Sequence, residues 1–271
     1  MPSNPLNPEF LTVMARMGVR PDPIDPKKGS LKVSEGLESH GVVRVAPLML
    51  LADMIVGMEL ESSVKDWTFT TDFSFRRGFP SKGKIIEARS RILRHGKRIF
   101  IEELDYLDES GNSIGYAQIT FLRTPLREGE MKPDISNIRM RMAKNEIPDL
   151  DQPIGDLSGI RVEDPSIGRA VLFPHDAVRR PGGFVQGAIM TLLGEISAQS
   201  FGENYFGEPC SVTALDARYM VGGRSGPLTT TAQWVTSPDQ GFIRVSLVDE
   251  GHQVLSCSFL AEVVPSSHLS L

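Results

Sequence analysis

Two stretches of the chain, residues 31–123 and 157–271, repeat the same order of hydrophobic and polar positions. In each stretch, a strand-like run leads into a longer segment that is apolar on nearly every side. Alternating runs separated by turn signals follow, which is typical of antiparallel strands joined by hairpins. These predicted strands are residues 67–76, 84–93, 98–108 and 113–122 in the first stretch, and residues 210–220, 228–235, 242–250 and 254–263 in the second.

Matching landmarks keep a constant spacing between the two stretches. Asp53 lies in the first apolar segment and Glu195 in the second, 142 positions later. Thr71 and Thr213, each in the first predicted strand after its apolar segment, are also 142 positions apart. This period is too long for a solenoid repeat, so we predict two copies of one domain-sized unit.

The two apolar segments, residues 46–60 and 184–198, predict helices without a wide polar stripe. Such a helix must be enclosed, and these two are too short to cross a bilayer. The strands after each helix can enclose it if their sheet curls around it. The pattern therefore predicts an α+β fold with two antiparallel sheets, each wrapped around a long central helix, and the two units can pair their sheets edge to edge.

Two proline-rich regions lie outside the repeated units. Residues 1–30 are predicted to form an N-terminal arm with a short helical piece. Residues 124–156 are predicted to be a linker between the first domain, 31–123, and the second, 157–271. Within the linker, residues 135–144 predict a short helix with Asp134 as its N-cap.

The composition narrows the function classes. Of 271 residues, 40% are hydrophobic and 23% charged, as in ordinary globular proteins. Lys and Arg number 29 against 34 Asp and Glu, which argues against a nucleic-acid partner and an anionic membrane partner. The 2 cysteines exclude a disulfide framework, and the 5 histidines have no metal-ligand spacing, so we expect no metal. The sequence shows no membrane-length apolar run and no signal peptide, so we expect a cytoplasmic protein.

Each predicted helix keeps one carboxylate, Asp53 or Glu195, inside an apolar surrounding. Burying a carboxylate is costly unless it is hydrogen-bonded or its pKa rises, so both are candidate reactive groups. The alternative is an acid that only satisfies neighbouring backbone or threonine groups.

The segment VQGAIMTLLGE, residues 185–195, resembles the helix-start motif of hotdog-fold acyl-CoA thioesterases of the phenylacetic-acid-degradation type. That motif runs Val-His-Gly-Gly, followed by an apolar stretch and an acid nine positions after the histidine. Gln186 stands at the histidine position, Gly187 and Ala188 at the glycines, and Glu195 at the acid. The likeness extends to Gly183 in the preceding loop, where Arg180 replaces the usual asparagine.

The first half fits the same frame in VRVAPLMLLADMIVG, residues 43–57. Arg44 takes the histidine position, Val45 and Ala46 the glycine positions, and Asp53 the acid position. The resemblance, which covers about 200 residues of the 271, implies a tandem double-hotdog fold.

The resemblance also implies composite sites, in which one unit's helix start binds the thioester carbonyl and the other unit supplies the acid. It implies hydrolysis of an acyl-CoA to a free acid and CoA, with CoA present only as part of the substrate and no separate cofactor. One site combines Gln186 and Gly187 with Asp53 and Thr71. The other combines Arg44 and Val45 with Glu195 and Thr213.

We expect the two sites to be unequal. Gly187 leaves its backbone N–H unobstructed, whereas Val45 crowds the helix start and Arg44 can pair with Glu195. The working site is therefore expected at Asp53 and Gly187, and the Arg44 site is expected to be degenerate. A further likeness to longer double-hotdog thioesterases, which use an Asp, a Ser or Thr and a Gln, adds Gln118 as a candidate substrate-binding residue, beside Gly183 and Arg180.

Two alternatives stay open. A hotdog dehydratase or hydratase needs a histidine against the acid, and His40 is the candidate. A non-catalytic acyl-CoA-binding module is suggested by the missing motif histidines. In each case, open sheet edges favour a homodimer of the double unit.

Overall fold

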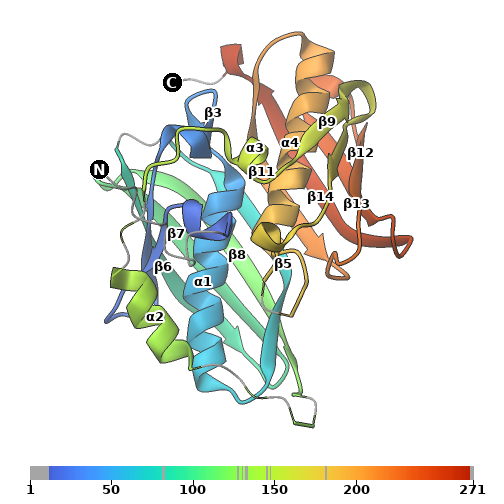
Figure 1. Ribbon diagram of the computed structural model, residues 1–271. Coiled ribbons are helices and arrows are strands. Elements are labelled where there is room, and N and C mark those ends of the chain that lie inside the picture. Colours follow the sequence, from blue (N-terminus) through green and yellow to red (C-terminus); the bar gives the residue numbers. More distant parts are fainter. Residues whose placement is uncertain are drawn as a thin grey trace, which may run out of the picture.

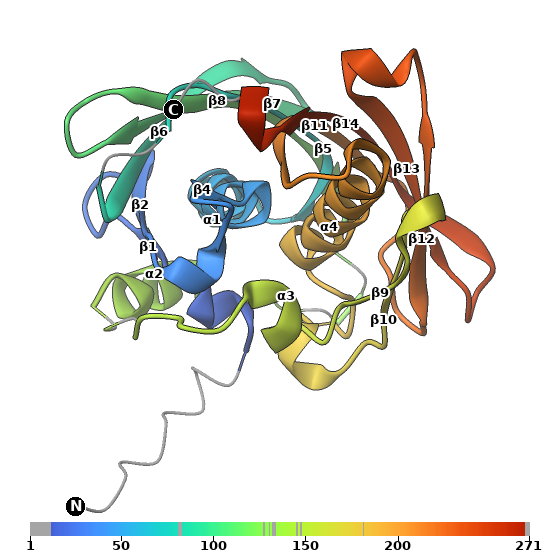
Figure 2. The ribbon, with the colours of Figure 1, turned by 90° about the horizontal axis from the view of Figure 1, so that it is seen from above.

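The computed structural model describes residues 12–80, 83–126, 128–129, 131, 134–144, 146, 148–180 and 182–268. Two long helices lie side by side in front of one extended, curved sheet (Figures 1 and 2). The helices are α1 (Val45–Ser63), α2 (Ile135–Lys144), α3 (Ile154–Leu157) and α4 (Gly187–Phe206). Short 3₁₀ helices are Met14–Arg16, Glu35–Leu37, Pro165–Ile167, Asp176–Val178, Pro238–Gln240 and Ser266–His268.

The strands of the first half are β1 (Val19–Pro21), β2 (Lys28–Lys32), β3 (Glu38–Ser39), β4 (Val42–Val43), β5 (Trp67–Arg77), β6 (Ile85–His95), β7 (Ile99–Asp108) and β8 (Ser113–Thr124). Those of the second half are β9 (Arg161–Asp164), β10 (Arg169–Leu172), β11 (Cys210–Tyr219), β12 (Leu228–Trp234), β13 (Phe242–Asp249) and β14 (Val254–Pro265). Strands β3 and β4 form a separate small hairpin.

The remaining strands form a single 12-stranded antiparallel sheet, in the order β1-β2-β6-β7-β8-β5-β11-β14-β13-β12-β10-β9. The sequence predicted two sheets. The structure joins them because β5 pairs with β11 along Asp72–Arg76, so the edge-to-edge pairing of the halves is continuous. On either side of the β5–β11 pair, which we call the seam, corresponding strands of the two halves follow in the same order. This arrangement is expected of two copies related by a pseudo-twofold axis.

Both long helices are enclosed, as their composition requires. Helix α1 packs against β1, β2, β5, β6 and β8, whereas α4 packs against β10 to β14 and also against α1. Figure 2 shows each helix held against the concave side of the sheet. The buried residues of both helices belong to one hydrophobic core. Burial of this apolar surface, rather than helix propensity, holds the two helices in place.

The regions outside the predicted units are partly structured. Within the predicted linker, α2 has the predicted bounds, and the Asp134 carboxylate accepts the N–H of Asn137 at 3.2 Å as an N-cap. Strand β1 and the start of β2 lie inside the predicted N-terminal arm and join the sheet edge. Residues 1–11 of that arm lie outside the described residues. Among the described residues, the helices are all too short or too polar to span a bilayer.

Candidate active site

The two long helices run antiparallel, so the start of each lies beside the acid of the other. Val45, the first residue of α1, contacts Glu195, while Gln186, the N-cap of α4, contacts Asp53. The pseudo-twofold axis between the halves therefore creates two composite positions of the same design. Their chemistry differs.

At the first position, two side chains hold the Asp53 carboxylate. Thr70 from β5 donates its hydroxyl to Oδ1 at 2.5 Å, and the Gln186 amide donates to Oδ2 at 3.0 Å. Asp53, Thr70 and Gln186 are all partly accessible to solvent. The structure therefore brings together the acid predicted in the first half and the Gln186 predicted in the second, and leaves both partly accessible to solvent.

Burial raises the pKa of Asp53 above the ordinary aspartate value. The hydrogen bonds from Thr70 and Gln186 and the nearby charge of Arg180 oppose that rise, because they stabilise the ionised form. A carboxylate with a raised pKa that is still held by two donors suits a general base.

Gly187 is the first residue of α4, so its backbone N–H precedes the first hydrogen bond within the helix. The next N–H, of Ala188, is taken by Oε1 of Gln186. An N–H at this end of a helix lies at the positive pole of the helix dipole and can stabilise an oxyanion. A Cβ added at Gly187 would lie 3.3 Å from the Met49 methyl group and 3.8 Å from the Tyr219 ring.

A chain of hydrogen bonds runs from Tyr219 to Asp53. The Thr191 hydroxyl donates to the Gly187 carbonyl at 3.0 Å, so the Tyr219 hydroxyl is the donor in its 2.5 Å contact with Thr191. The same peptide donates through Ala188 N–H to Gln186, which donates to Asp53. Every donor points toward the carboxylate, an order that reinforces each bond.

The second position is closed by its own acid. The Glu195 carboxylate, 3% exposed, accepts the N–H groups of Val45 at 2.9 Å and Ala46 at 3.1 Å, both fully buried. Pro47 follows and has no N–H, so Glu195 occupies the free donors at the start of α1. Asp53 is one methylene shorter than Glu195 and is held by Gln186, and within the described part of the chain no group accepts the Gly187 N–H.

The predicted ion pair between Arg44 and Glu195 is corrected by the structure. Arg44 donates to Gln199 at 2.9 Å instead, because the Glu195 oxygens are already bound to backbone N–H groups. The charge near Glu195 is the half-buried Arg77, whose pKa is lowered by desolvation to about 10. The cavity between Glu195 and Arg77 measures only about 10 Å³, room for a single water.

The structure also corrects the prediction that Thr71 lies beside Asp53. Thr71 donates to Asp72 at 2.8 Å, and its neighbour Thr70 contacts Asp53. The reason is a β-bulge: the pairing of β5 with β8 shifts register between Thr70 and Asp72, which leaves Thr71 as the extra residue. Thr213 is the extra residue of the matching bulge in β11 and contacts Glu262 at 2.8 Å, not Glu195.

Two other candidates lie away from Asp53. Gln118 is exposed on the outer face of β8, where it donates to the Tyr116 hydroxyl at 2.7 Å, while Ala117 and Ile119 face the core. The structure therefore does not bring Gln118 to the predicted site. His40 lies 2.8 Å from Glu203 in the β3–β4 turn, at the opposite end of the helix pair, and gives a dehydratase no histidine beside Asp53.

Gly183 and Arg180 belong to a turn directly before α4. Gly183 has a φ of +82°, which favours glycine, and its N–H donates to the Arg180 carbonyl at 3.1 Å. The Arg180 guanidinium stacks over Phe69, the neighbour of Thr70, at 4.8 Å from the ring centre. Both residues thus lie at the margin of the Asp53 site.

The sequence matches no family model, and no curated protein matches it. Solved structures do resemble it. A putative oleoyl thioesterase from Lactobacillus plantarum aligns over 94% of this chain and 99% of its own, with 12% identity and a TM-score of 0.61. The tesB protein of Mycobacterium avium subs paratuberculosis aligns over 93% and 97%, with 10% identity and a TM-score of 0.62. An acyl-ACP thioesterase from Bacteroides thetaiotaomicron aligns over 88% and 98%, with 12% identity and a TM-score of 0.57.

The chain has the fold of these thioesterases. Each alignment spans both halves and nearly the whole of the other protein, so the likeness includes the joined sheet and the helix pair. At 10–12% identity the comparison carries the fold and not the chemistry.

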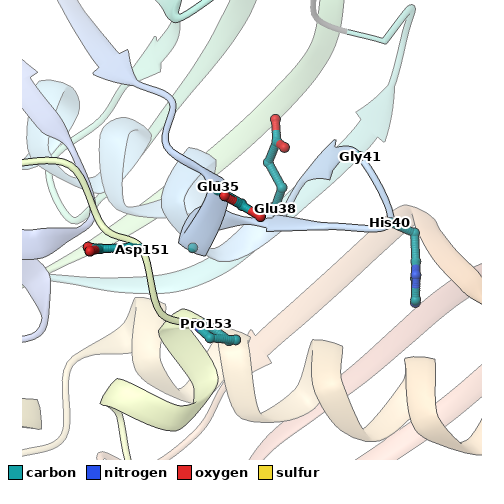
Figure 3. A pocket seen from close by; sticks show the side chains of 7 residues that line it. Glu35, Glu38, His40, Gly41, Asp151 and Pro153 are labelled. Carbon is teal, nitrogen blue, oxygen red and sulfur yellow. The ribbon is translucent and has the colours of Figure 1, made fainter.

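A larger hollow of about 580 Å³ lies elsewhere, between the β3–β4 hairpin and the segment before α3 (Figure 3). Its lining includes Glu35, Glu38 and Asp151 with His40, and it shares no residue with the Asp53 site. Among the described residues, no group of three or more His, Cys, Asp and Glu side chains could hold a metal ion.

Sequence reasoning missed Thr70 and Tyr219. The alternation of side chains along β5 places Thr71 on the core face, because Phe73 and Phe75 are buried and residues two apart share a face. The buried Thr68 shows that the even-numbered residues face the core before the bulge. Tyr219 occupies the repeat position of Arg77, 142 residues later, but no signal in the sequence connected either residue with the two acids.

Proposed function

We propose that the protein is an acyl thioesterase of the tandem hotdog type, hydrolysing an acyl-CoA or a related acyl thioester at one composite site. The observation that supports this most is the pairing of a held, partly accessible carboxylate, Asp53, with the start of a helix from the other half. The shared fold with named thioesterases supports the same reaction class.

In the proposed reaction, the Gly187 N–H binds the thioester carbonyl oxygen. Asp53 removes a proton from a water molecule as its oxygen attacks the carbonyl carbon, and the developing oxyanion stays bound to Gly187. The C–S bond then breaks, the thiolate leaves and takes up the proton, and the acyl group leaves as the free acid. Thr70 and Gln186 hold the Asp53 carboxylate in one orientation during these steps.

The test is release of free thiol from a panel of acyl-CoA and acyl-carrier-protein substrates of varied chain length. Turnover that depends on Asp53 supports the proposal. Binding of acyl-CoA without any thiol release would instead support a non-catalytic binding module. Association into a homodimer through the open edges β1 and β9 stays a prediction, which light scattering of the purified chain tests.

The pH profile is a second expected result. A general base works only when ionised, so kcat/KM should rise with pH and level off above the pKa of Asp53. Because burial raises that pKa, the acid limb should lie above the ordinary aspartate value of about 3.9. Initial rates between acid and neutral pH, under conditions where the protein stays folded, measure it. A profile that is flat across this range would contradict Asp53 as the base.

Gly187→Ala tests the helix start. The added Cβ meets only the flexible Met49 methyl closely, so the fold should be retained. We expect kcat/KM to fall about tenfold, less than the roughly 10²–10³ that loss of an oxyanion donor costs. Gly57→Ala in α1, where a Cβ would meet Phe121 at an ordinary 3.6 Å, is the matched control. An equal effect of both variants would point to altered helix packing instead.

A further inference from the structure

Two arginines near the start of α4 are oriented by aromatic rings, and the charge of one of them, Arg180, acts on Asp53. Arg180 stacks over Phe69 at 4.8 Å from the ring centre, and Arg224 stacks over Phe184 at 4.9 Å. Within the described part of the chain, neither guanidinium is in ion-pair contact with a carboxylate. Stacking on a ring orients the planar guanidinium and leaves its N–H edge free to bind an anion.

Backbone contacts join the two arginines into one rim. Arg180 and Phe184 pair across the turn before α4, with an N–H to carbonyl distance of 2.9 Å. Val185 N–H donates to the Gly223 carbonyl at 2.8 Å. The Arg179 guanidinium binds the carbonyls of both Gly183 and Arg224, the latter at 2.9 Å. We call the described residues of these two segments, 179–180, 182–185 and 222–226, the arginine rim.

The Arg224 side of the rim is anchored by a buried acid that the proposed reaction does not use. Asp249, which is fully buried, accepts the N–H groups of Arg224 at 2.8 Å, Ser225 at 3.0 Å and Gly226 at 2.8 Å. Burial alone would raise the pKa of Asp249, but these three donors outweigh it and lower the pKa to about 2. The carboxylate is therefore ionised and holds the loop that presents Arg224.

Neither arginine forms an ion pair within 4 Å among the described residues, so both guanidinium groups can bind an added anion. Guanidinium groups bind phosphate oxygens through two parallel hydrogen bonds, and a local positive charge raises the encounter rate of an anionic ligand. The acyl thioesters of the proposed reaction have a phosphate at the far end of the pantetheine arm, both in CoA and in an acyl carrier protein.

We infer that Arg180 and Arg224 form a binding subsite for the phosphate of a phosphopantetheine arm, which orients the thioester toward Asp53 and Gly187. This inference rests on the proposed function. It makes the rim, rather than the acyl-binding surface, the part of the protein that selects the thiol carrier.

The experiment compares wild type with Arg224→Gln and Arg180→Gln on four substrates that have one acyl group: S-acyl-pantetheine, S-acyl-phosphopantetheine, acyl-CoA and acyl carrier protein. Loss of a charge-assisted contact should raise KM by roughly tenfold to a hundredfold on the three phosphate-containing substrates. On S-acyl-pantetheine, which has no phosphate, KM should not change in Arg224→Gln. Arg180→Gln also removes a charge that acts on Asp53, so its effect is measured as the ratio of KM on each phosphate-containing substrate to KM on S-acyl-pantetheine. Arg89→Gln, which removes an exposed arginine of β6, controls for net charge.

The substrate arms also separate the two sources of phosphate. If the variants raise KM by the same factor on S-acyl-phosphopantetheine and on acyl carrier protein, the phosphate of the arm itself is the ligand. If the increase in KM is larger on acyl-CoA than on the other two, the subsite also contacts the nucleotide phosphates of CoA. If Arg224→Gln raises KM equally on all four substrates, or if neither variant raises KM more on the phosphate-containing substrates than on S-acyl-pantetheine, the inference is overturned.

Binding of CoA itself keeps this inference separate from the proposed reaction. Calorimetry with CoA needs no turnover, so a weaker affinity in Arg224→Gln supports the subsite even if wild type hydrolyses none of the four substrates. In that case the proposed function fails and the subsite stands. If wild type turns over substrate while KM and CoA affinity are unchanged in both variants, the subsite fails and the proposed function stands.

Discussion

Replacing Asp53 by asparagine is expected to lower kcat/KM for thioester hydrolysis by about 10²–10⁴-fold, the range that a positioned general base contributes. Asparagine has nearly the same shape, and its amide can still accept from Gln186 and donate to the Thr70 oxygen. The contacts of the site are thus retained while the base is lost. Initial rates of thiol release across the substrate panel measure the effect.

The same variant should not be less stable. Burial raises the pKa of Asp53 in the folded state, so its ionisation at neutral pH costs stability, and that cost grows as pH rises above the unfolded value. Asparagine removes this cost, and its thermal midpoint at neutral pH should equal or exceed that of wild type. Asp72→Asn, on the outer face of the sheet, is the control. Full activity in Asp53→Asn would remove Asp53 from the mechanism.

Replacing Glu195 by alanine is expected to cost about 2–6 kcal/mol of unfolding free energy, because it leaves two buried N–H groups unsatisfied at about 1–3 kcal/mol each. The substitution leaves the buried N–H groups of Val45 and Ala46 without acceptors and removes the negative charge near the half-buried Arg77. Urea unfolding, with the slope compared between variants, measures the loss.

Glu195→Gln separates the charge from the shape. Its amide oxygen can still accept one of the two backbone N–H groups, so it should lose less stability than Glu195→Ala. At temperatures where each variant is folded, kcat/KM should stay close to wild type, because the Asp53 site lies at the other end of the helix pair. A large fall in kcat without a fall in stability would instead identify Glu195 as the working acid.

The sequence predicted the regular elements closely because their burial leaves a strong local pattern. The strands β5 to β8 and β11 to β14 and the two enclosed helices lie where alternating and uniformly apolar runs predicted them. The spacing of 142 residues holds in detail, since Thr71 and Thr213 are the extra residues of matching bulges. The sequence left out β1, which has only three residues and no alternation to detect.

The site was only partly predictable because it depends on which face each side chain takes. Side chains in a strand alternate, so one inserted residue moves every earlier side chain to the opposite face. That shift places Thr70 and not Thr71 beside Asp53, and no pattern in the sequence marks the bulge. The wrong assignment of Gln118 to the site was avoidable, because the apolar Ala117 and Ile119 on either side already indicate that Gln118 faces outward.

The seam between β5 and β11 has a consequence for how such a protein can change. In an assembly of two identical chains, both helix starts must share one sequence, so a mutation that fills one anion site fills the other. Here the halves are covalently joined and each helix start is encoded separately. One end of the helix pair was free to become a permanent internal anchor through Glu195, while the other kept a bare glycine. Under the proposed function, the covalent link lets one helix start hold the internal anchor Glu195 while the other keeps Gly187 for the reaction.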